Sequence, residues 1–281
     1  MPLLHAIILG IIQGLTEFLP VSSSAHLALI PWLLGWSDQG LSFDIALHVG
    51  TVLAVIVYFF RDWVQIIAQG FGLHIGSDSA LRRNPRLLWL LVLGSVPAGI
   101  AGLLVKDLAE NVWRNNQYLI GSMLILVGLF MWWADRQGSR SKDLGTVTPG
   151  DSLTIGTAQA LALVPGVSRS GITICAGLLR NLDRPSAARF SFLLATPAIA
   201  GAAAKDAWDL MRHGGGIAGI PHDMRTALIV GVVVSAITGA LTIQFFLNFL
   251  RRQSLSFFVW YRLVFGIIVI ALATFFRYHG G

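Results

Sequence analysis

Charged residues are scarce in this sequence. Only 12% of the 281 residues are Asp, Glu, Lys or Arg, while 55% are hydrophobic. Soluble domains carry about 25% charged residues, so the composition excludes a soluble globular protein. Several apolar runs approach the roughly 20 residues that a helix needs to cross a hydrocarbon core about 30 Å thick. The sequence therefore predicts a multi-pass membrane protein.

Cysteine and acidic residues are also rare. Cys175 is the single cysteine, which excludes an internal disulfide, and we interpret it as a small apolar core residue. The 14 Asp and Glu residues against 20 Lys and Arg residues leave a net charge of +6. Because the basic residues mostly flank apolar runs, we attribute them to loop orientation and contact with anionic lipid, not to nucleic-acid binding.

Six apolar runs are predicted to be full membrane spans. They cover residues 43–60, 87–104, 118–134, 187–204, 226–249 and 258–276. Residues 62–75 predict an amphipathic helix on the membrane surface. Two further apolar segments, 3–34 and 153–180, are interrupted by Pro, Gly and polar residues. Irregular backbone at membrane depth must be surrounded by protein or water, so each is predicted to be a re-entrant or broken helical hairpin.

The two interrupted segments resemble each other. The first contains "GIIQGLTEFLPVSSSAH" and the second "GTAQALALVPGVSRSG". The shared positions are Gly10 and Gly156, Gln13 and Gln159, and Pro20 and Pro165, the last pair after one gap. Three spans follow each hairpin, and because three is odd the second copy enters the membrane from the opposite side. The sequence predicts an all-α membrane domain over residues 1–281, built as an inverted repeat of 1–135 and 150–281.

Basic residues in the loops predict the orientation. One set of loops holds eleven: Arg61, Arg82, Arg83, Arg86, Arg136, Arg140, Lys142, Arg180, Arg184, Arg251 and Arg252. The other set holds six: Lys106, Arg114, Lys205, Arg212, Arg225 and Arg277. Cytoplasmic loops carry the excess of basic residues, so the first hairpin is expected to enter from outside.

The first hairpin places ionisable groups inside an apolar segment, and such groups are functional candidates by default. Pro20 ends one half-helix, and the serines after it are good N-cap residues for a second one, whose free N–H groups bind anions. In a helix, Ser23 and His26 share a face, and a hydroxyl beside an imidazole is an activated nucleophile. Glu17 would then orient the imidazole. The alternative is that the serines only cap a kinked helix and that His26 satisfies them.

The second hairpin adds Arg169, whose planar fork suits phosphate oxygens. Hydroxyl groups of Ser168, Ser170 and Thr173 surround it in sequence. Two opposed helix N-termini and one arginine indicate a phosphorylated ligand. Alternatively, Arg169 forms an ion pair with Glu17 that only holds the hairpins together, and both interpretations can hold at once.

Three other polar residues receive structural interpretations. His48 is interpreted as a satisfied core histidine, with a contact at the rim of the site as the alternative. Asp44 and Arg262 are interpreted as span-end residues.

These motifs resemble the undecaprenyl-diphosphate phosphatases of the bacitracin-resistance type. "QGLTEFLPVSSSAH" fits that family's (E/Q)xxxE and PVSSxxH patterns, and "PGVSRSGIT" fits PGxSRSxxT. The stretches at residues 43–59 and 189–202 are also similar. The resemblance implies hydrolysis of undecaprenyl diphosphate, a long-chain isoprenyl diphosphate, to the monophosphate carrier of cell-wall synthesis. It also implies a bacterial inner-membrane protein, and we expect its site to open to the outer, periplasmic side.

By motif position, the resemblance makes Glu17, Ser23, His26 and Arg169 the catalytic candidates. The candidates for substrate phosphate contacts are Gln13, Ser22, Ser24, Ser168, Ser170 and Thr173. Glu17 is also the candidate ligand for Mg²⁺ or Ca²⁺, which support activity in the family. Gln13 stands where many members have Glu, which weakens any carboxylate role at that position. Ser23, His26 and a water molecule all stay open as the nucleophile.

The expected partners are the isoprenyl diphosphate and the lipid bilayer, with no nucleic acid, and a homodimer stays open. The alternative function is a transporter of a lipid phosphate or an ion, or a combined phosphatase and flippase, because inverted repeats with broken helices are typical of secondary transporters.

Overall fold

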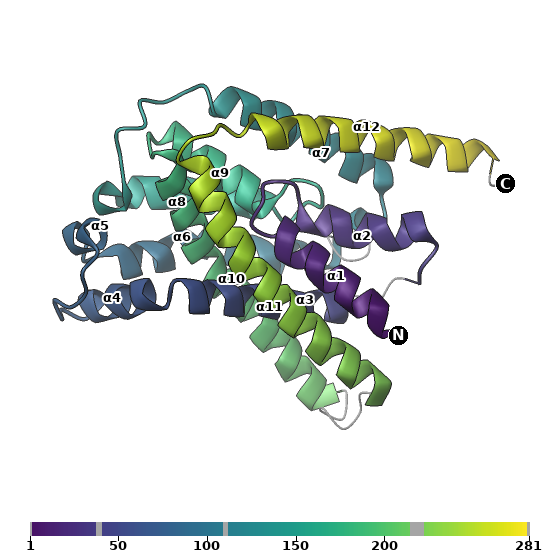
Figure 1. Ribbon diagram of the computed structural model, residues 1–281, viewed down its shortest axis with the longest axis horizontal. Helices are drawn as coiled ribbons and strands as arrows, with labels where there is room; N and C mark the ends of the chain where they lie inside the picture. The colour runs from purple at the N-terminus through teal and green to yellow at the C-terminus, as the bar shows by residue number, and fades with distance from the viewer. Residues whose placement is uncertain (1, 38–40, 109–111, 214–221, 280–281) are drawn as a thin grey trace.

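The computed structural model describes residues 2–37, 41–108, 112–213 and 222–279, and this part of the chain is helical throughout its regular structure (Figure 1). Its α-helices are α1 Leu3–Thr16, α2 Ser23–Leu34, α3 Leu41–Tyr58, α4 Phe60–Gly70, α5 Ser79–Arg83, α6 Leu87–Leu108, α7 Gln117–Ala134, α8 Pro149–Leu161, α9 Arg169–Leu179, α10 Arg184–His213, α11 His222–Leu250 and α12 Ser256–His279. One short 3-10 helix, η2, covers Leu144–Thr146.

The long apolar helices confirm a multi-pass membrane protein. Within the described residues, α6, α7, α10, α11 and α12 are long and apolar enough to cross a membrane. They coincide with five of the six predicted spans and are longer than each, from one residue more in α7 to twelve more in α10. The extension is expected, because a helix continues beyond the hydrocarbon core until a cap or a turn ends it.

The sixth predicted span is part of a bent pair. Helices α3 and α4 meet at Phe59 with an angle of 76°, and together they qualify as a sixth span. The amphipathic helix predicted over residues 62–75 is present as α4, but it begins earlier and ends at Gly70. Gly72, with φ of +86°, and Gly76, with φ of +95°, follow it. Both adopt backbone that other residues rarely reach, which turns the chain back toward α5.

Both interrupted segments are broken helical hairpins, as predicted. The first consists of α1 and α2, separated by residues 17–22, and the second of α8 and α9, separated by residues 162–168. The second hairpin begins at Pro149, a few residues before the predicted start, because Thr148 caps its first turn in a capping box with Asp151.

Glycines let the hairpins pack closely against long helices. Helix α11 crosses α1 and α3, and α12 lies along α7 (Figure 1). A Cβ on Gly14 would lie 2.8 Å from the main-chain nitrogen of Gly239 on α11. A Cβ on Gly156 would lie 2.0 Å from the carbonyl oxygen of Gly94 on α6. Helices in a membrane associate through close van der Waals packing and not through the hydrophobic effect, and small residues at the crossings allow this close packing.

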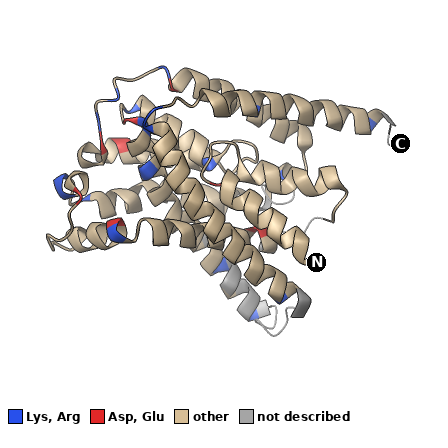
Figure 2. Ribbon diagram, in the orientation of Figure 1, with Lys and Arg blue, Asp and Glu red and all other residues tan. Residues whose placement is uncertain are grey.

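Charged residues gather at the end of the molecule that holds α4, α5 and the start of α8, while the long helices α7, α11 and α12 carry few of them (Figure 2). Asp151 accepts from Lys142 Nζ at 3.0 Å and from Arg180 Nε at 2.7 Å. Burial alone would raise the pKa of Asp151, but hydrogen bonds from Thr148, Arg180 and Lys142 lower it to about 2. Ion pairs of this kind fix the loops from which the second hairpin starts.

Candidate active site

The two hairpin breaks have the same local backbone. Ser22 and Ser168 are the N-caps of α2 and α9, with φ of 75° and 74°. Positive φ is uncommon outside glycine and costs free energy. Each serine hydroxyl accepts from the main-chain N–H three residues later, at 3.4 Å for Ala25 and 3.1 Å for Gly171. Each break therefore presents the N–H groups at the start of a helix, which is a site for an anion.

This likeness corrects the register of the predicted repeat. The same offset of 146 residues separates Ser22 from Ser168 and Ser24 from Ser170. Within each break the two serine hydroxyls are in contact, Ser22 with Ser24 at 3.2 Å and Ser168 with Ser170 at 3.3 Å. No gap is needed, so Pro20 corresponds to Gly166 and not to Pro165. Ser23 and Arg169, the first residues of α2 and α9, occupy equivalent places.

Glu17 is the residue on which the two hairpins converge. Its carboxylate is buried. It accepts from Ser23 Oγ at 2.7 Å, from Arg169 Nη2 at 2.9 Å and from Gln13 Nε2 at 3.1 Å. The ion pair with Arg169 joins the hairpins across 152 residues of sequence. Four predicted site residues are thus brought into direct contact.

Arg169 is held by a third element as well. Its Nη1 donates to the carbonyl oxygen of Ser191 on α10 at 2.9 Å and contacts the hydroxyl of Ser191 at 3.3 Å. That hydroxyl lies 2.6 Å from Thr173 Oγ1. Thr173 thus belongs to the support of Arg169. The hydroxyl of Ser170 donates to the carbonyl oxygen of Leu19 at 3.1 Å, which joins the breaks a second time.

Two buried polar atoms beside Glu17 have no hydrogen-bond partner within the described residues. They are Nε of Arg169, a donor, and Oε1 of Gln13, an acceptor. Unsatisfied buried groups of this kind are rare and costly in proteins. An anion suits the free donor and a cation suits the free acceptor, so the cluster has chemistry for both.

His26 faces away from Ser23, which corrects the predicted pairing of these two residues. Its Nδ1 lies 2.7 Å from the carbonyl oxygen of Ser22 and its Nε2 lies 2.6 Å from the hydroxyl of Tyr261. A carbonyl oxygen only accepts, so Nδ1 carries the proton and Nε2 accepts from the phenol. The imidazole lies against the ring of Phe265 on α12, with ring centres 4.8 Å apart. Glu17 contacts Ser23 and does not orient His26.

Two residues near the cluster were not predicted as site residues. His48 lies with Nε2 3.4 Å from Glu17 Oε2, while its Nδ1 contacts the carbonyl oxygen of Asp44 at 2.7 Å. This matches the alternative interpretation of His48 as a contact with the site, and both ring nitrogens also have partners, as the favoured interpretation expected. Ser191 lies in the stretch at residues 189–202, whose similarity to the family was the only signal for it.

Asp44 lies in the first turn of α3, at the end of a span as interpreted, but Arg262 differs from that interpretation. Arg262 is the largest fully buried side chain among the described residues. Its nitrogens contact carbonyl oxygens of both breaks, at Pro20, Gly166 and Val167. Asp44 is buried and pairs with Arg114 at 2.5 Å.

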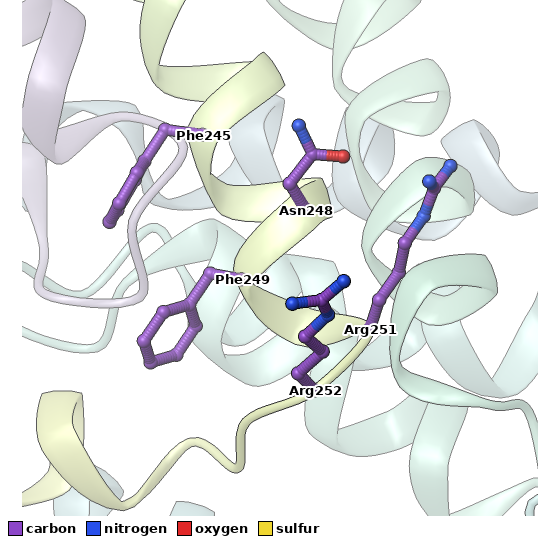
Figure 3. Close-up of a pocket in the computed structure, with 5 residues that line it drawn as sticks. All are labelled: Phe245, Asn248, Phe249, Arg251 and Arg252. Atoms are coloured by element: carbon purple, nitrogen blue, oxygen red, sulfur yellow. The ribbon is translucent and has the colours of Figure 1, made fainter.

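The surface hollow at the end of α11 lies apart from this cluster. It encloses about 420 Å³ and is lined by Phe245, Asn248, Phe249, Arg251 and Arg252. Figure 3 shows the two phenylalanine rings on one side of the helix end and Asn248 and Arg251 on the other. None of these residues belongs to the breaks. Arginines beside aromatic rings at a helix end are typical of membrane-interface anchors.

Comparison with known proteins gives one consistent result. The family model described as "Bacitracin resistance protein BacA" matches residues 6–268. The "Undecaprenyl-diphosphatase" of Pelotomaculum thermopropionicum is 46% identical over 278 residues, which cover 98% of each chain. The protein of the same name from Trichlorobacter lovleyi is 48% identical over 272 residues, 97% of each chain. That from Moorella thermoacetica is 44% identical over 272 residues, 97% of this chain and 98% of the relative.

Proposed function

The chain belongs to the bacitracin resistance protein BacA family, and on that premise we propose that it hydrolyses undecaprenyl diphosphate to undecaprenyl phosphate and inorganic phosphate. The single observation that carries the proposal beyond the family is the contact of Glu17 with Ser23 and Arg169 between two half-helix N-termini. Anion-binding helix ends, a guanidinium and a hydroxyl are the groups that phosphoryl transfer requires.

The diphosphate lies between the two breaks in this proposal. The N–H groups at the starts of α2 and α9 and the free Nε of Arg169 neutralise its charge. The bond between the terminal phosphorus and the bridging oxygen breaks, and the terminal phosphorus gains an oxygen from water. Inorganic phosphate leaves, and the prenyl monophosphate keeps the bridging oxygen. Ser23 and Arg169 are both half-buried, while the residues on either side of Arg169 are buried. Ser24 is half-buried as well, so Ser23, Ser24 and Arg169 are the side chains of this pair of helix starts that a ligand can reach.

Two bases are available to the attacking group. Glu17 already accepts the hydrogen of the Ser23 hydroxyl, so the carboxylate can take that proton if Ser23 attacks. In its neutral form His26 has its lone pair on Nε2, so that form can deprotonate a water or attack phosphorus itself once the Tyr261 hydroxyl is exchanged for the ligand. All three nucleophiles stay open, and the test below separates Ser23 from the other two.

A divalent cation fits the same cluster. Mg²⁺ is commonly held by one or two carboxylates together with substrate phosphates. Glu17 supplies the carboxylate, and the unpartnered Oε1 of Gln13 supplies a neutral oxygen beside it. Bound there, Mg²⁺ or Ca²⁺ would offset charge on the phosphate oxygens.

We further propose that the two halves form an inverted repeat and that the site opens to the outer side of the membrane. The equivalent breaks at Ser22 and Ser168 support the repeat. The excess of basic residues in one set of loops supports the orientation. A homodimer stays a proposal without a specific contact behind it.

Release of inorganic phosphate from a long-chain isoprenyl diphosphate by the purified protein tests the proposed function. We expect release in detergent, with a loss on addition of a chelator that Mg²⁺ or Ca²⁺ restores. If a thermal unfolding transition shows that the protein is folded and it releases no phosphate under any of these conditions, the proposal is overturned.

Replacing Ser23 with alanine should lower kcat by more than about 30-fold, beyond the roughly three- to tenfold that loss of one hydrogen bond explains. The reason is that the hydroxyl held on Glu17 would be the attacking group, while Arg169 and the helix ends still bind the phosphates. Single-turnover measurements separate chemistry from binding. A loss of only three- to tenfold would assign the attack to His26 or to water. Ser139→Ala, in an exposed loop, is the matched control.

Replacing Glu17 with glutamine should raise the Mg²⁺ concentration needed for half-maximal activity by at least about tenfold, because one carboxylate ligand is lost. Glutamine keeps the shape of the side chain and removes its charge. Titrations of Mg²⁺ and of Ca²⁺ against phosphate release give the midpoint for each protein. The same midpoint in wild type and variant would show that Glu17 acts through Ser23 and Arg169 and not through a metal.

A further inference from the structure

Arg262 has a set of partners that the proposed mechanism does not use. The side chain comes from α12, is fully buried, and donates only to main-chain carbonyl oxygens. The contacts are Nη1 to Pro20 at 3.3 Å, Nη2 to Gly166 at 2.7 Å, Nη2 to Val167 and to Met123 at 3.2 Å each, and Nε to Leu124 at 3.2 Å. One guanidinium thus contacts the first break, the second break and α7.

The contacts with the two breaks are at equivalent places. Pro20 lies two residues before the N-cap Ser22, and Gly166 lies two residues before the N-cap Ser168. The carbonyl oxygens of both residues accept from the terminal nitrogens of Arg262. Because a guanidinium is planar and rigid, these hydrogen bonds fix how far apart the two breaks lie.

The charge of Arg262 has no carboxylate partner among the ion pairs of the described residues. Its partners are neutral carbonyl oxygens from three segments. Burying a guanidinium in this way costs free energy that an apolar side chain of similar size would not. Its presence is therefore explained better by the geometry it imposes than by stability. The unneutralised charge behind two half-helix N-termini also favours an anion in front of them.

We propose that Arg262 is the positioning residue that sets the spacing between the two breaks, and through it the spacing between Ser23 and Arg169. This inference rests on the proposed function. Ser23 and Arg169 each lie three residues after a carbonyl that Arg262 holds, so a shift of either carbonyl moves one of them. A displacement of about 1 Å at a catalytic group can cost on the order of 100-fold in rate.

The test compares Arg262 with another arginine that forms a fork. Arg184 donates through Nε and Nη2 to Asp135, at 2.6 and 3.0 Å, away from both breaks. The variants are Arg262→Lys, Arg262→Gln, Arg184→Lys and Arg184→Gln, each purified in detergent. For each we would measure Tm, the folded fraction, kcat and KM for the isoprenyl diphosphate, and the shift of Tm with inorganic diphosphate.

Arg262→Gln should lower kcat per folded molecule by at least about 100-fold, while KM changes by less than about threefold because the surfaces for the prenyl tail are intact. Arg262→Lys keeps the charge but not the fork, so its kcat should still fall by at least about tenfold. We expect inorganic diphosphate to raise the Tm of the wild type, and both variants should lose that rise. The Arg184 variants should lower Tm and leave kcat per folded molecule unchanged.

A kcat of Arg262→Gln within about threefold of wild type would overturn the proposal, as would a loss that only follows the unfolded fraction. If Arg262→Gln does not fold, Arg262→Lys decides, and wild-type kcat in that variant would refute the positioning role. A wild type that releases no phosphate would overturn the proposed function instead. The diphosphate-induced shift of Tm would then still judge Arg262, and an unchanged shift in Arg262→Lys would refute the role.

Discussion

Arg169→Ala should lower phosphate release by at least about 1,000-fold, because it removes a charge from the ligand and leaves Glu17 buried without its cation. Removing one partner of a buried ion pair costs roughly 3–5 kcal/mol, and losing one preorganised contact to the transition state costs about 10² to 10³ in kcat. The 2.9 Å contact with Glu17 and the contact with Ser191 show that the protein's own groups hold Arg169 in place. The measurement is kcat from single turnovers of purified protein.

The control lies at the other end of the same helix. Arg180 follows the last residue of α9 and pairs with Asp151 at 2.7 Å. Arg180→Ala removes an ion pair of the same type, so it should lower Tm while kcat per folded molecule stays close to wild type. Arg169→Lys covers the case in which the alanine variant does not fold. A lysine variant with nearly wild-type kcat would show that charge alone suffices and that the fork has no role.

His26→Gln should lower kcat by about 10² to 10⁴, the range that a positioned general base contributes. Glutamine can still contact the carbonyl of Ser22 or the hydroxyl of Tyr261, so the break should keep its shape. What it lacks is a basic nitrogen at Nε2. The exposed His74→Gln is the control for loss of an imidazole elsewhere. Nearly normal turnover of His26→Gln would remove His26 from the mechanism.

Tyr261→Phe refines the same prediction. The phenol contacts the nitrogen of His26 that would act as the base, so its loss should leave kcat within about tenfold, the effect of losing one hydrogen bond. A loss as large as that of His26→Gln would mean that the phenol itself takes part in proton transfer.

Hydropathy and helix-breaking residues predicted most of the fold. The runs at residues 87–104 and 226–249 are long and apolar, and a helix satisfies all main-chain hydrogen bonds of such a run within the membrane. Pro20 and the serines after it, and "PGVS" in the second hairpin, marked both breaks because proline ends a helix and serine begins one. The 76° bend at Phe59 had no such signal, since no Pro or Gly lies at the junction.

The sequence predicted which residues form the candidate site better than it predicted the contacts between them. Gln13, Glu17, Ser23 and Arg169 follow from the motifs, and they do meet. The pairing of Ser23 with His26 followed from helical spacing alone. It failed because His26 contacts the carbonyl of its own N-cap residue and a tyrosine from α12, and sequence spacing does not show such a neighbour.

The burial of Arg262 could not be predicted from the sequence. A charged residue near the end of an apolar run usually extends to the membrane surface, and nothing in "VWYRLVF" indicates otherwise. Its burial depends on carbonyl oxygens supplied by segments about 100 and 240 residues earlier in the chain, and the broken hairpins free those oxygens from helical pairing.

The equivalence of Ser23 and Arg169 has a consequence for how this molecule can have arisen. The breaks before α2 and α9 have the same local backbone, yet the first residue of α2 carries a hydroxyl and the first residue of α9 a guanidinium. A pair of identical halves would offer two hydroxyls or two guanidinium groups, never one of each. The chemistry therefore needs the symmetry of the backbone to be broken in the side chains. The complete set of groups therefore needs both breaks, because neither break alone carries a hydroxyl and a guanidinium at the first residue of its helix.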